Sequence, residues 1–399
     1  SGGCVVARSN GAKALGIKGG TPYFKLQQQF PNNDIAVFSS NYELYGELTS
    51  RVVDIIKQEA PAYFRYSIDE CFVYFNDVPT DNLKNWGENL HLKIKKWVGM
   101  PVSIGIGPNK TLAKVASHFA KKVKGYKHCC MIDNEEKRVK ALKLYPVEEV
   151  WGIGRRYSNK LQSLGINTAY DFASQPGIWV KSHFNNIVIY RTWQELNGLD
   201  SVPNEEYAKK QSICTSRSFP SLIPDFETLR TQVSNFASRC AEKLRSQNSV
   251  ASIVSVFINT NPFREDLLQY WNYHEIRLLT PSNASITIVD AAIEALEKVY
   301  RPGFQYKKTG VIVMGVMPEK PIQPDLFDFK PEMYEKLRQI DDALDRINRI
   351  YGSETIVLGA QQYTQPNGEG KADVFANSIR HDHRSPNPTT RWSDIIKLK

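Results

Sequence analysis

Two adjacent acids, Asp69 and Glu70, stand between short apolar runs at residues 62–68 and 71–75. If those runs are buried strands, two carboxylates at their junction are costly unless a metal ion or another cation compensates the charge. A hairpin tip can turn neighbouring carboxylates toward one point, whereas a straight strand sends them to opposite faces. Hard oxygen ligands of this kind suit Mg²⁺, which also takes ligands from substrate phosphates. The pattern predicts a Mg²⁺ site, and an ordinary acidic turn is the alternative.

A glycine-containing segment at residues 105–114 joins a predicted strand to a predicted helix. It is not a nucleotide-binding P-loop, because Asn109 stands where the required glycine belongs and the loop is too short. The helix start could still bind phosphate through its dipole and the ammonium groups of Lys110 and Lys114. An ordinary surface helix is the alternative.

Gly152 and Gly154 lie in a turn between two short predicted helices. This pattern is typical of a helix-hairpin-helix, in which glycines let backbone N–H groups approach a DNA phosphate without obstruction by side chains. Three nearby cations would add affinity that is independent of base sequence: Arg155, Arg156 and Lys160. A plain turn between helices is the alternative.

Two further stretches place cations where a phosphate could bind. Near the start, Arg8 and Lys13 lie on or beside a short predicted helix of small residues, which suits a triphosphate. Farther along, Ser216 and Arg217 lie in a predicted strand that could follow a phosphate backbone. The alternative there is an edge strand kept soluble by a charge.

Composition narrows the class of protein. The 399 residues carry a net charge of +9, and their number predicts two to four domains. The segment 110–143 holds ten Lys or Arg against three acids. Such a stretch favours a polyanionic partner, because neutralised phosphates release condensed counterions, and a solvated basic face is the alternative.

Cysteine usage and the lack of long apolar runs bear on location. The six cysteines are scattered with no C-x-x-C pair, which predicts reduced thiols in a cytoplasm rather than disulfides or a zinc site. No apolar run approaches the ~20 residues that a bilayer crossing needs, and the first residues lack the features of a signal peptide. We therefore expect a cytoplasmic protein with no membrane partner.

Apolar periodicity predicts the elements that position these residues. Residues 35–106 follow the order strand, helix, strand, strand, helix, strand, which is typical of a ferredoxin-like arrangement, and the first strand is expected at 35–38. The same order returns between residues 211 and 317, and a small helical segment at 144–203 lies between the two units. A proline-rich linker then precedes a helix at 333–351, and residues 361–399 are expected to be extended or partly disordered. The predicted fold class is α+β with several domains.

Three motifs in this order resemble those of the Y-family DNA polymerases: Ser-Ile-Asp-Glu at 67–70, the segment 105–114, and Trp-Gly-Ile-Gly at 151–154. Stretches at 39–45, 216–219, 277–281 and 389–394 resemble the UmuC branch, the catalytic subunit of DNA polymerase V. The resemblance covers essentially the whole chain.

The resemblance implies four parts: fingers and palm at 1–143, a thumb at 144–203, a little finger at 204–318, and a linker with a tail at 319–399. It implies error-prone DNA-directed synthesis past damaged template bases in the SOS response, with primer–template DNA and dNTP as substrates and two Mg²⁺ ions. A UmuD-like accessory dimer and a RecA filament are the implied partners.

The resemblance also implies residue roles. Asp69 and Glu70 would hold Mg²⁺, Arg8 and Lys13 would contact the incoming triphosphate together with Lys110 or Lys114, with Lys114 favoured. The thumb turn and the little finger would grip the DNA.

The family opens with a strand that carries another metal-binding Asp, followed by an aromatic residue that excludes ribonucleotides, and this chain begins after both. We therefore expect an incomplete sequence that extends primers poorly as written. The alternative is a catalytically inactive, truncated DNA-binding subunit that only recruits partners.

One segment of the linker predicts a protein partner. Gln323, Leu326 and Phe327 resemble the short Gln-x-x-Leu-Phe peptide by which bacterial polymerases hold the sliding clamp. In an extended segment, Leu326 and Phe327 can fill an apolar pocket while Gln323 hydrogen-bonds at its rim.

Overall fold

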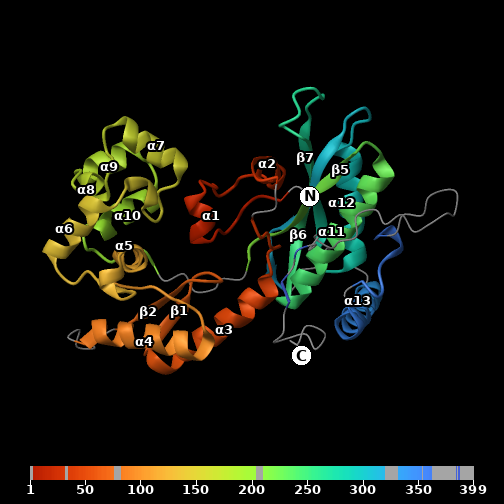
Figure 1. Cartoon of the computed structure of the whole chain (residues 1–399). Helices are drawn as coiled ribbons and strands as arrows, with labels where there is room; N and C mark the ends of the chain where they lie inside the picture. The colour runs from red at the N-terminus through yellow and green to blue at the C-terminus, as the bar shows by residue number, and fades with distance from the viewer. Residues whose placement is uncertain are drawn as a thin grey trace. The chain divides into compact units, whose positions relative to one another are not determined.

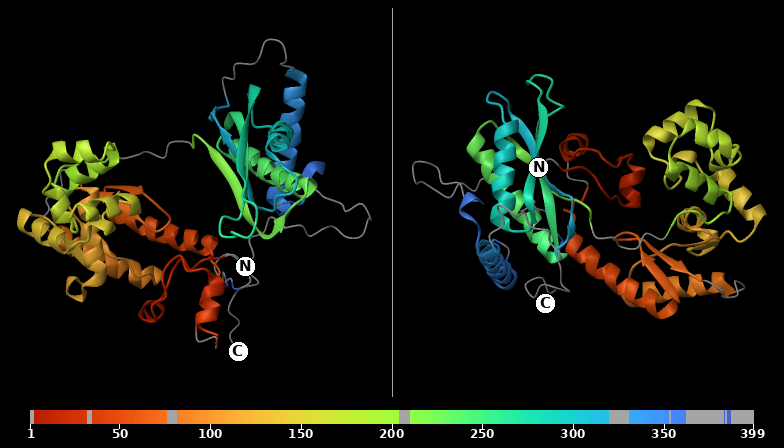
Figure 2. Two further views of the ribbon diagram at one scale, coloured as in Figure 1. Left: turned by 90° about the horizontal axis from the view of Figure 1, so that it is seen from above. Right: turned by 180° about the vertical axis from the view of Figure 1, so that it is seen from behind.

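The computed structural model describes residues 3–31, 35–75, 82–203, 210–319, 331–352, 354–361, 383 and 385–386. The chain divides into two compact units, each described by itself: the first unit comprises residues 38–206 and 383–399, and the second comprises residues 1–37 and 207–382 (Figure 1). Both contain helices and sheets, so the α+β class is confirmed (Figure 2). None of the helices in the described ranges has the length and apolarity that a bilayer crossing requires.

The first unit begins with two helices and a hairpin. The elements are α3 (Tyr42–Glu59), β1 (Ala62–Arg65), β2 (Cys71–Tyr74) and α4 (Leu83–Val98). The Asn41 side chain accepts a hydrogen bond from the Leu44 amide and so starts α3. The apolar stripes of α3 and α4 meet in a small core that contains Ile56 and Ile94. β1 and β2 pair antiparallel, with Arg65 opposite Cys71, and this register places residues 66–70 at the hairpin tip.

The strand expected at residues 35–38 is absent, and that prediction is wrong. Within the described residues, β1–β2 is one two-stranded sheet and β3 (Ile104–Ile106) with β4 (Cys129–Met131) is another. An apolar run becomes a strand only where a neighbouring strand takes its backbone hydrogen bonds. Next to this run, the Ser39 amide instead donates to the His383 carbonyl oxygen, 2.9 Å away.

Helices make up the rest of the first unit. They are α5 (Lys110–Lys122), α6 (Glu135–Leu144), α7 (Arg155–Ser163), α8 (Ala169–Ala173), α9 (Gly177–His183) and α10 (Ile187–Leu196). The prediction that residues 144–203 are mainly helical is therefore confirmed. One buried core joins α5 and α6 to this segment through Leu112, Leu142, Leu161 and Leu196. α5, which follows the glycine-containing loop, is thus held by the helical segment.

The second unit contains the repeated order that the periodicity predicted. Its main elements are β5 (Ile213–Ile223), α11 (Phe226–Ser246), β6 (Ser249–Thr260), β7 (Trp271–Ser282), α12 (Ser285–Val299) and β8 (Tyr306–Met314). The strands lie side by side in the order β5-β8-β6-β7, and α11 and α12 cover one face of the sheet (Figure 1). The short strand β9 (Met317–Pro318) pairs with β6, and the helices α1 (Asn10–Ala14) and α2 (Tyr23–Gln29) precede this domain in the chain. β5 runs through Pro220, which an edge strand tolerates because its outer side needs no hydrogen bond.

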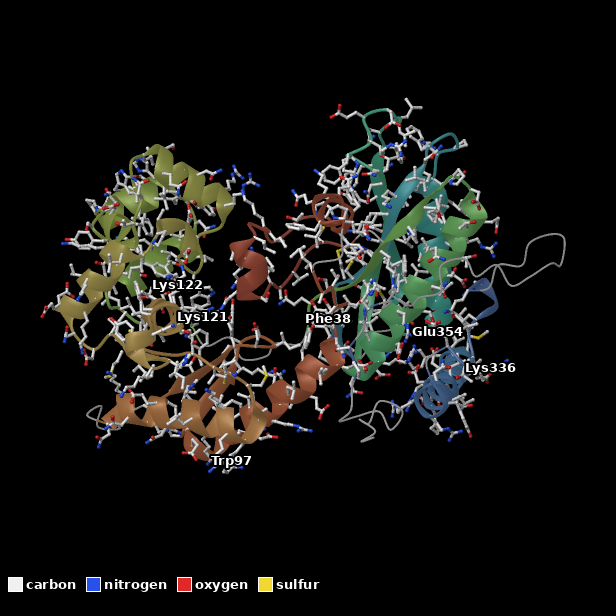
Figure 3. The ribbon with its side chains drawn as sticks, viewed as in Figure 1. Phe38, Trp97, Lys121, Lys122, Lys336 and Glu354 are labelled. Atoms are coloured by element: carbon white, nitrogen blue, oxygen red, sulfur yellow. The ribbon has the colours of Figure 1, made fainter. Side chains whose placement is uncertain are left out.

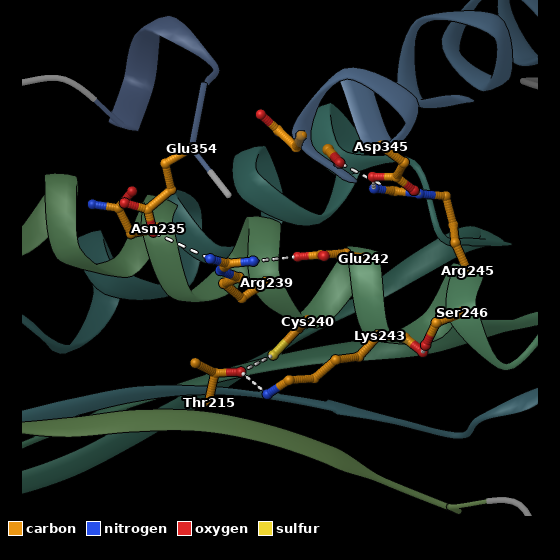
Figure 4. Close-up of polar contacts among 12 residues, drawn as sticks. Thr215, Asn235, Arg239, Cys240, Glu242, Lys243, Arg245, Ser246, Asp345 and Glu354 are labelled. Atoms are coloured by element: carbon orange, nitrogen blue, oxygen red, sulfur yellow. Dashed lines mark hydrogen bonds and ion pairs between the residues drawn. The ribbon is translucent and has the colours of Figure 1, made fainter. Parts of the chain in front are cut away.

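The predicted helix near the C-terminus is confirmed as α13 (Pro331–Tyr351), and it docks on α11 and α12. The buried Asp341 carboxylate accepts a hydrogen bond from the Ser285 amide, 3.0 Å away, in the first turn of α12. Arg245 of α11 donates to both carboxylate oxygens of Asp345 at 2.7 and 2.8 Å (Figure 4). α13 is therefore part of the folded second unit. The tail expected at 361–399 lies almost wholly outside the described residues.

Candidate functional site

The two predicted carboxylates lie together at the β1–β2 tip. The amides of Tyr66 and Ser67 donate to the Glu70 carbonyl oxygen at 3.0 and 3.1 Å, which closes the loop. The Ser67 hydroxyl donates to Asp69 Oδ1 at 2.7 Å and accepts from the Glu70 amide at 3.1 Å. The hairpin-tip prediction is confirmed. The predicted burial is wrong, because the two-stranded hairpin leaves both side chains exposed, and 47% of the Glu70 side-chain surface is accessible.

A cation does compensate the charge of Glu70. The Lys114 ammonium, on the first turns of α5, lies 2.9 Å from Glu70 Oε1 and 3.0 Å from Oε2. In the described part of the chain, no group of three or more His, Cys, Asp or Glu residues is placed to hold a metal ion. Asp69 and Glu70 therefore offer a metal two carboxylates, and further ligands have to come from elsewhere.

Three aromatic rings surround the Lys114 ammonium. The ring centroids of Tyr66, Trp151 and Phe72 lie 5.1, 5.2 and 6.0 Å from Nζ. The indole Nε1 of Trp151 donates to the Tyr66 hydroxyl at 3.2 Å. Sequence reasoning missed this aromatic cage (Tyr66, Phe72 and Trp151). Its only signal in the sequence is that each ring lies within three residues of a predicted site residue.

Lys110 and backbone amides at the start of α5 form hydrogen bonds within the protein. Lys110 is buried, and its ammonium donates to the Val202 carbonyl oxygen. The Thr111 amide donates to Oε2 of the fully buried Glu195 at 2.8 Å, and the Asn109 side chain caps the Leu112 amide at 2.9 Å. The chain itself therefore satisfies these two amides and the Lys110 ammonium, while the predicted phosphate contact of Lys114 stays a prediction.

The glycines before α5 serve close packing. A Cβ atom at Gly105 would lie 2.0 Å from the Ala113 carbonyl oxygen, and one at Gly107 would lie 2.8 Å from the Ala113 amide. Only glycine lets β3 lie this close to the α5 backbone.

The glycine turn of the predicted helix-hairpin-helix joins a short 3₁₀ turn, Val147–Glu149, to α7. Gly152 has a φ of +91°, and a Cβ there would lie 2.5 Å from Thr192 Oγ1. Gly154 precedes α7, whose start has no side-chain cap, and a Cβ there would meet nothing within 4 Å. Uncapped amides at an open turn suit a phosphate.

The cations beside this turn differ in their surroundings. Arg155 and Arg156 are exposed on the first turn of α7. Lys160 instead donates to the His183 carbonyl oxygen and lies 4.8 Å from the Phe184 ring centroid. The two arginines are thus better placed than Lys160 to reach a ligand in solvent.

The cations of the basic stretch at 110–143 also differ in their surroundings. Lys121 and Lys122 are exposed on the last turn of α5 (Figure 3). Lys122 lies 3.5 Å from Glu149, and Lys137 forms an ion pair with Asp133 at 2.7 Å. Part of the stretch is therefore a solvated face with local ion pairs.

The remaining predicted residues of the second unit lie in two places. Arg8 donates to the Ile17 carbonyl oxygen at 2.9 Å, and Lys13 is exposed on α1.

Ser216 and Arg217 point to opposite faces of β5, as neighbours in a strand must. Burial lowers the pKa of Arg217. The charges of Glu354 and Arg239 also act on this guanidinium, which places it on the face of the sheet that the helices cover. Ser216 lies opposite Gly310 on the other face. Gln323, Leu326 and Phe327 lie outside the described residues.

Comparison with protein families adds an independent finding. The impB/mucB/samB family model matches residues 1–118, and the model of that family's C-terminal domain matches residues 210–326. A domain of unknown function matches residues 338–398, beginning within α13.

Individual relatives are similar over most of the chain. Protein UmuC of Salmonella typhimurium strain LT2 is 36% identical over 400 residues, which span 100% of this chain and 92% of that protein. DNA polymerase IV of Clostridium acetobutylicum is 27% identical over 364 residues, which span 89% of this chain and 86% of that protein. A solved Y-family DNA polymerase chimera is 18% identical with a TM-score of 0.58, covering 79% of this chain and 91% of that one. This last likeness shows the fold.

Proposed function

The chain belongs to the UmuC branch of the Y-family translesion DNA polymerases, and on that premise we propose that it extends primers at Asp69 and Glu70 by Mg²⁺-dependent nucleotidyl transfer. It is a DNA-directed DNA polymerase, and its substrates are primer–template DNA and a nucleotide. The observation that carries the proposal is the pair of adjacent, exposed carboxylates at the hairpin tip, with the Lys114 ammonium beside Glu70.

A polymerase of this family depends on metal ions, and Mg²⁺ fits the residues present. Both side chains offer hard oxygen donors to solvent, and Mg²⁺ commonly takes one or two carboxylates together with substrate phosphates. Asp69 and Glu70 would hold such ions, which when bound would supply activation of the primer hydroxyl and neutralisation of charge on the leaving pyrophosphate. The Ser67 hydroxyl orients Asp69 through its 2.7 Å hydrogen bond.

Lys114, rather than Lys110, contacts the triphosphate in this proposal. The Lys114 ammonium reaches the carboxylate loop from α5, whereas the buried Lys110 ammonium is engaged by the Val202 carbonyl oxygen. An ammonium beside a phosphate stabilises charge that moves onto the leaving group. The family resemblance supports Arg8 and Lys13 as further proposed triphosphate contacts.

DNA binding is proposed for the thumb turn and the little finger. Backbone N–H groups at Gly152 and Gly154 approach a phosphate, and Arg155 and Arg156 add affinity that is independent of base sequence. Ser216 faces the side of the sheet away from α11, which makes it the better placed of the two predicted β5 contacts. The proposed bounds are 1–143 for the fingers and palm together, 144–203 for the thumb and 204–318 for the little finger.

Partners beyond the substrates are also part of the proposal. The segment with Gln323, Leu326 and Phe327 is proposed to bind the sliding clamp, because two apolar side chains and a glutamine in a proline-rich linker suit such docking. Membership of the UmuC branch supports a UmuD-like accessory dimer, a RecA filament and a cytoplasmic location in the SOS response.

Primer extension past an abasic template site, with the full-length protein, tests the catalytic role. Asp69→Asn and Glu70→Gln keep the size of each side chain, and each is expected to lower the extension rate at least about a hundredfold. Asp54→Asn is the matched control, since Asp54 is an exposed acid of α3 that pairs with Lys57 at 3.1 Å. Extension at the unaltered rate by both site variants, with DNA binding intact, would contradict the proposal.

A further inference from the structure

The aromatic cage joins the hairpin that carries the carboxylates to the turn that is proposed to bind DNA. Tyr66 and Phe72 flank the carboxylate loop, and Trp151 directly precedes Gly152. We infer that Trp151 is a positioning residue, which holds the Lys114 ammonium against Glu70 and in line with the substrate phosphates. The inference rests on the proposed function for its catalytic meaning, but the cage itself can be tested without it.

The geometry makes the cage a specific environment for a cation. The Trp151 ring centroid lies 5.2 Å from Lys114 Nζ, and the Tyr66 ring centroid lies 5.1 Å from it. The Tyr66 and Trp151 rings meet edge to face, with centroids 5.5 Å apart and an interplanar angle of 89°. Each ring presents electron density that attracts an ammonium within about 6 Å. Only 20% of the Lys114 side-chain surface is accessible, against 60% for Lys122 on the same helix.

The indole of Trp151 is itself held in place. Its Nε1 donates to the Tyr66 hydroxyl at 3.2 Å, and the Thr192 hydroxyl lies 3.4 Å from its carbonyl oxygen. Gly152 permits this backbone path, because its φ of +91° and its 2.5 Å clearance from Thr192 exclude a side chain. Trp151 is thus fixed from both sides, to α10 and to the hairpin.

A fixed indole limits the freedom of Lys114. A lysine side chain has four rotatable bonds, and an unconfined ammonium spreads over many positions. Glu70 alone leaves the ammonium free to swing around the carboxylate, whereas the rings close the sides of that path. Without Trp151, Lys114 should spend less time at the position from which it meets a phosphate.

Chemical labelling tests the cage without DNA, metal or nucleotide. The full-length protein is treated with acetic anhydride, and acylation of each lysine is followed by mass spectrometry. Trp151→Ala is expected to raise the acylation rate of Lys114 about fivefold, which is the factor that one cation–π contact represents. Trp151→Phe and Tyr66→Phe each keep a ring but lose the Nε1–hydroxyl bond, so each should raise the rate by less.

The chain offers a matched control. Trp97 of α4, labelled in Figure 3, has the Lys93 ammonium 4.4 Å from its ring centroid. Trp97→Ala should raise the acylation rate of Lys93 and leave that of Lys114 unchanged. The acylation rate of Lys122 should be the same in every variant. Unchanged Lys114 acylation in folded Trp151→Ala overturns the inference. If that variant does not fold, unchanged Lys114 acylation in both phenylalanine variants does so.

Kinetics then separate a positioning role from general stability. With primer–template DNA in place, Trp151→Ala should raise KM for the incoming nucleotide about fivefold, with kcat and the Kd for DNA each changed less than about twofold. Equal KM values in active Trp151→Ala and in the unaltered protein overturn the catalytic meaning of the cage. If the unaltered full-length protein does not extend primers at all, the proposed function is contradicted instead, and the labelling result still decides the cage.

Discussion

The Lys114 ammonium lies 2.9 and 3.0 Å from the two carboxylate oxygens of Glu70, although 44 positions in the chain separate the residues. An exposed carboxylate that a lysine contacts through both oxygens is neutralised without a metal ion. The same lysine lies beside the hairpin tip that carries both carboxylates, and it is the proposed contact of the triphosphate. In the proposed mechanism, Lys114 is therefore the lysine that contacts the triphosphate.

The two lysines of the α5 start should therefore respond differently to mutation. Lys114→Met removes a partly buried cation and is expected to weaken nucleotide binding about tenfold, with little change in stability. Lys110→Met leaves the Val202 carbonyl oxygen without its buried donor and should lower the free energy of unfolding by about 1–3 kcal/mol. Nucleotide titration of the DNA complex and urea unfolding measure the two effects. The opposite pattern would exchange the roles of the two lysines.

DNA binding should be tolerant of sequence and weaken steeply with salt. Arg155→Ala combined with Arg156→Ala removes two exposed cations beside the glycine turn, so the slope of log K against log salt should become less steep by about two. Fluorescence anisotropy on unrelated duplexes measures this. Arg51→Ala with Lys57→Ala changes net charge equally on α3, and an equal effect in that control would show that the turn has no special part.

The docking of α13 should depend on Asp341. Asp341→Ala leaves the Ser285 amide without its acceptor and removes one carboxylate from the surroundings of Arg245, so it should destabilise the second unit by about 2–3 kcal/mol. Asp342→Ala, at the exposed neighbouring position, should change stability by less than about 0.5 kcal/mol. Urea unfolding compares the two variants, and equal effects would remove the special role of Asp341.

Stability should fall at alkaline pH through Cys129. Burial raises the pKa of its thiol from 9.0 to about 11. As pH rises, the thiol of the unfolded chain ionises first, so this contribution is complete below pH 9 and is lost between about pH 9 and 11. Cys129→Ala should flatten the pH dependence of the free energy of unfolding by about 2 kcal/mol across that window. Identical pH profiles for the variant and the unaltered protein would rule this source out.

Clamp binding should depend on two apolar side chains of the linker. Leu326→Ala with Phe327→Ala is expected to abolish retention of the full-length protein by an immobilised cognate clamp, because those side chains fill the pocket. Extension of primers without the clamp should be unchanged. Retention equal to that of the unaltered protein would exclude this segment as the clamp ligand.

Several features followed from the sequence by itself, because their signals are local. Helical spacing predicted α11, α12 and α13, and two apolar runs around Asp69 and Glu70 predicted the hairpin tip. The family followed from motifs that keep a fixed order, and comparison with UmuC confirmed it. Local spacing failed at residues 35–38, since a strand requires a partner that no single segment encodes.

Only the tertiary structure decided which predicted groups are available for chemistry. The buried Glu195, 84 positions from Thr111, satisfies the α5 start, and the Val202 carbonyl oxygen engages Lys110. Trp151, 85 positions from Tyr66, completes the cage around Lys114. These contacts arise because distant segments fold against one another, and a carboxylate or ring from a distant helix changes what a lysine can do. Residue type and spacing along the chain do not record that proximity.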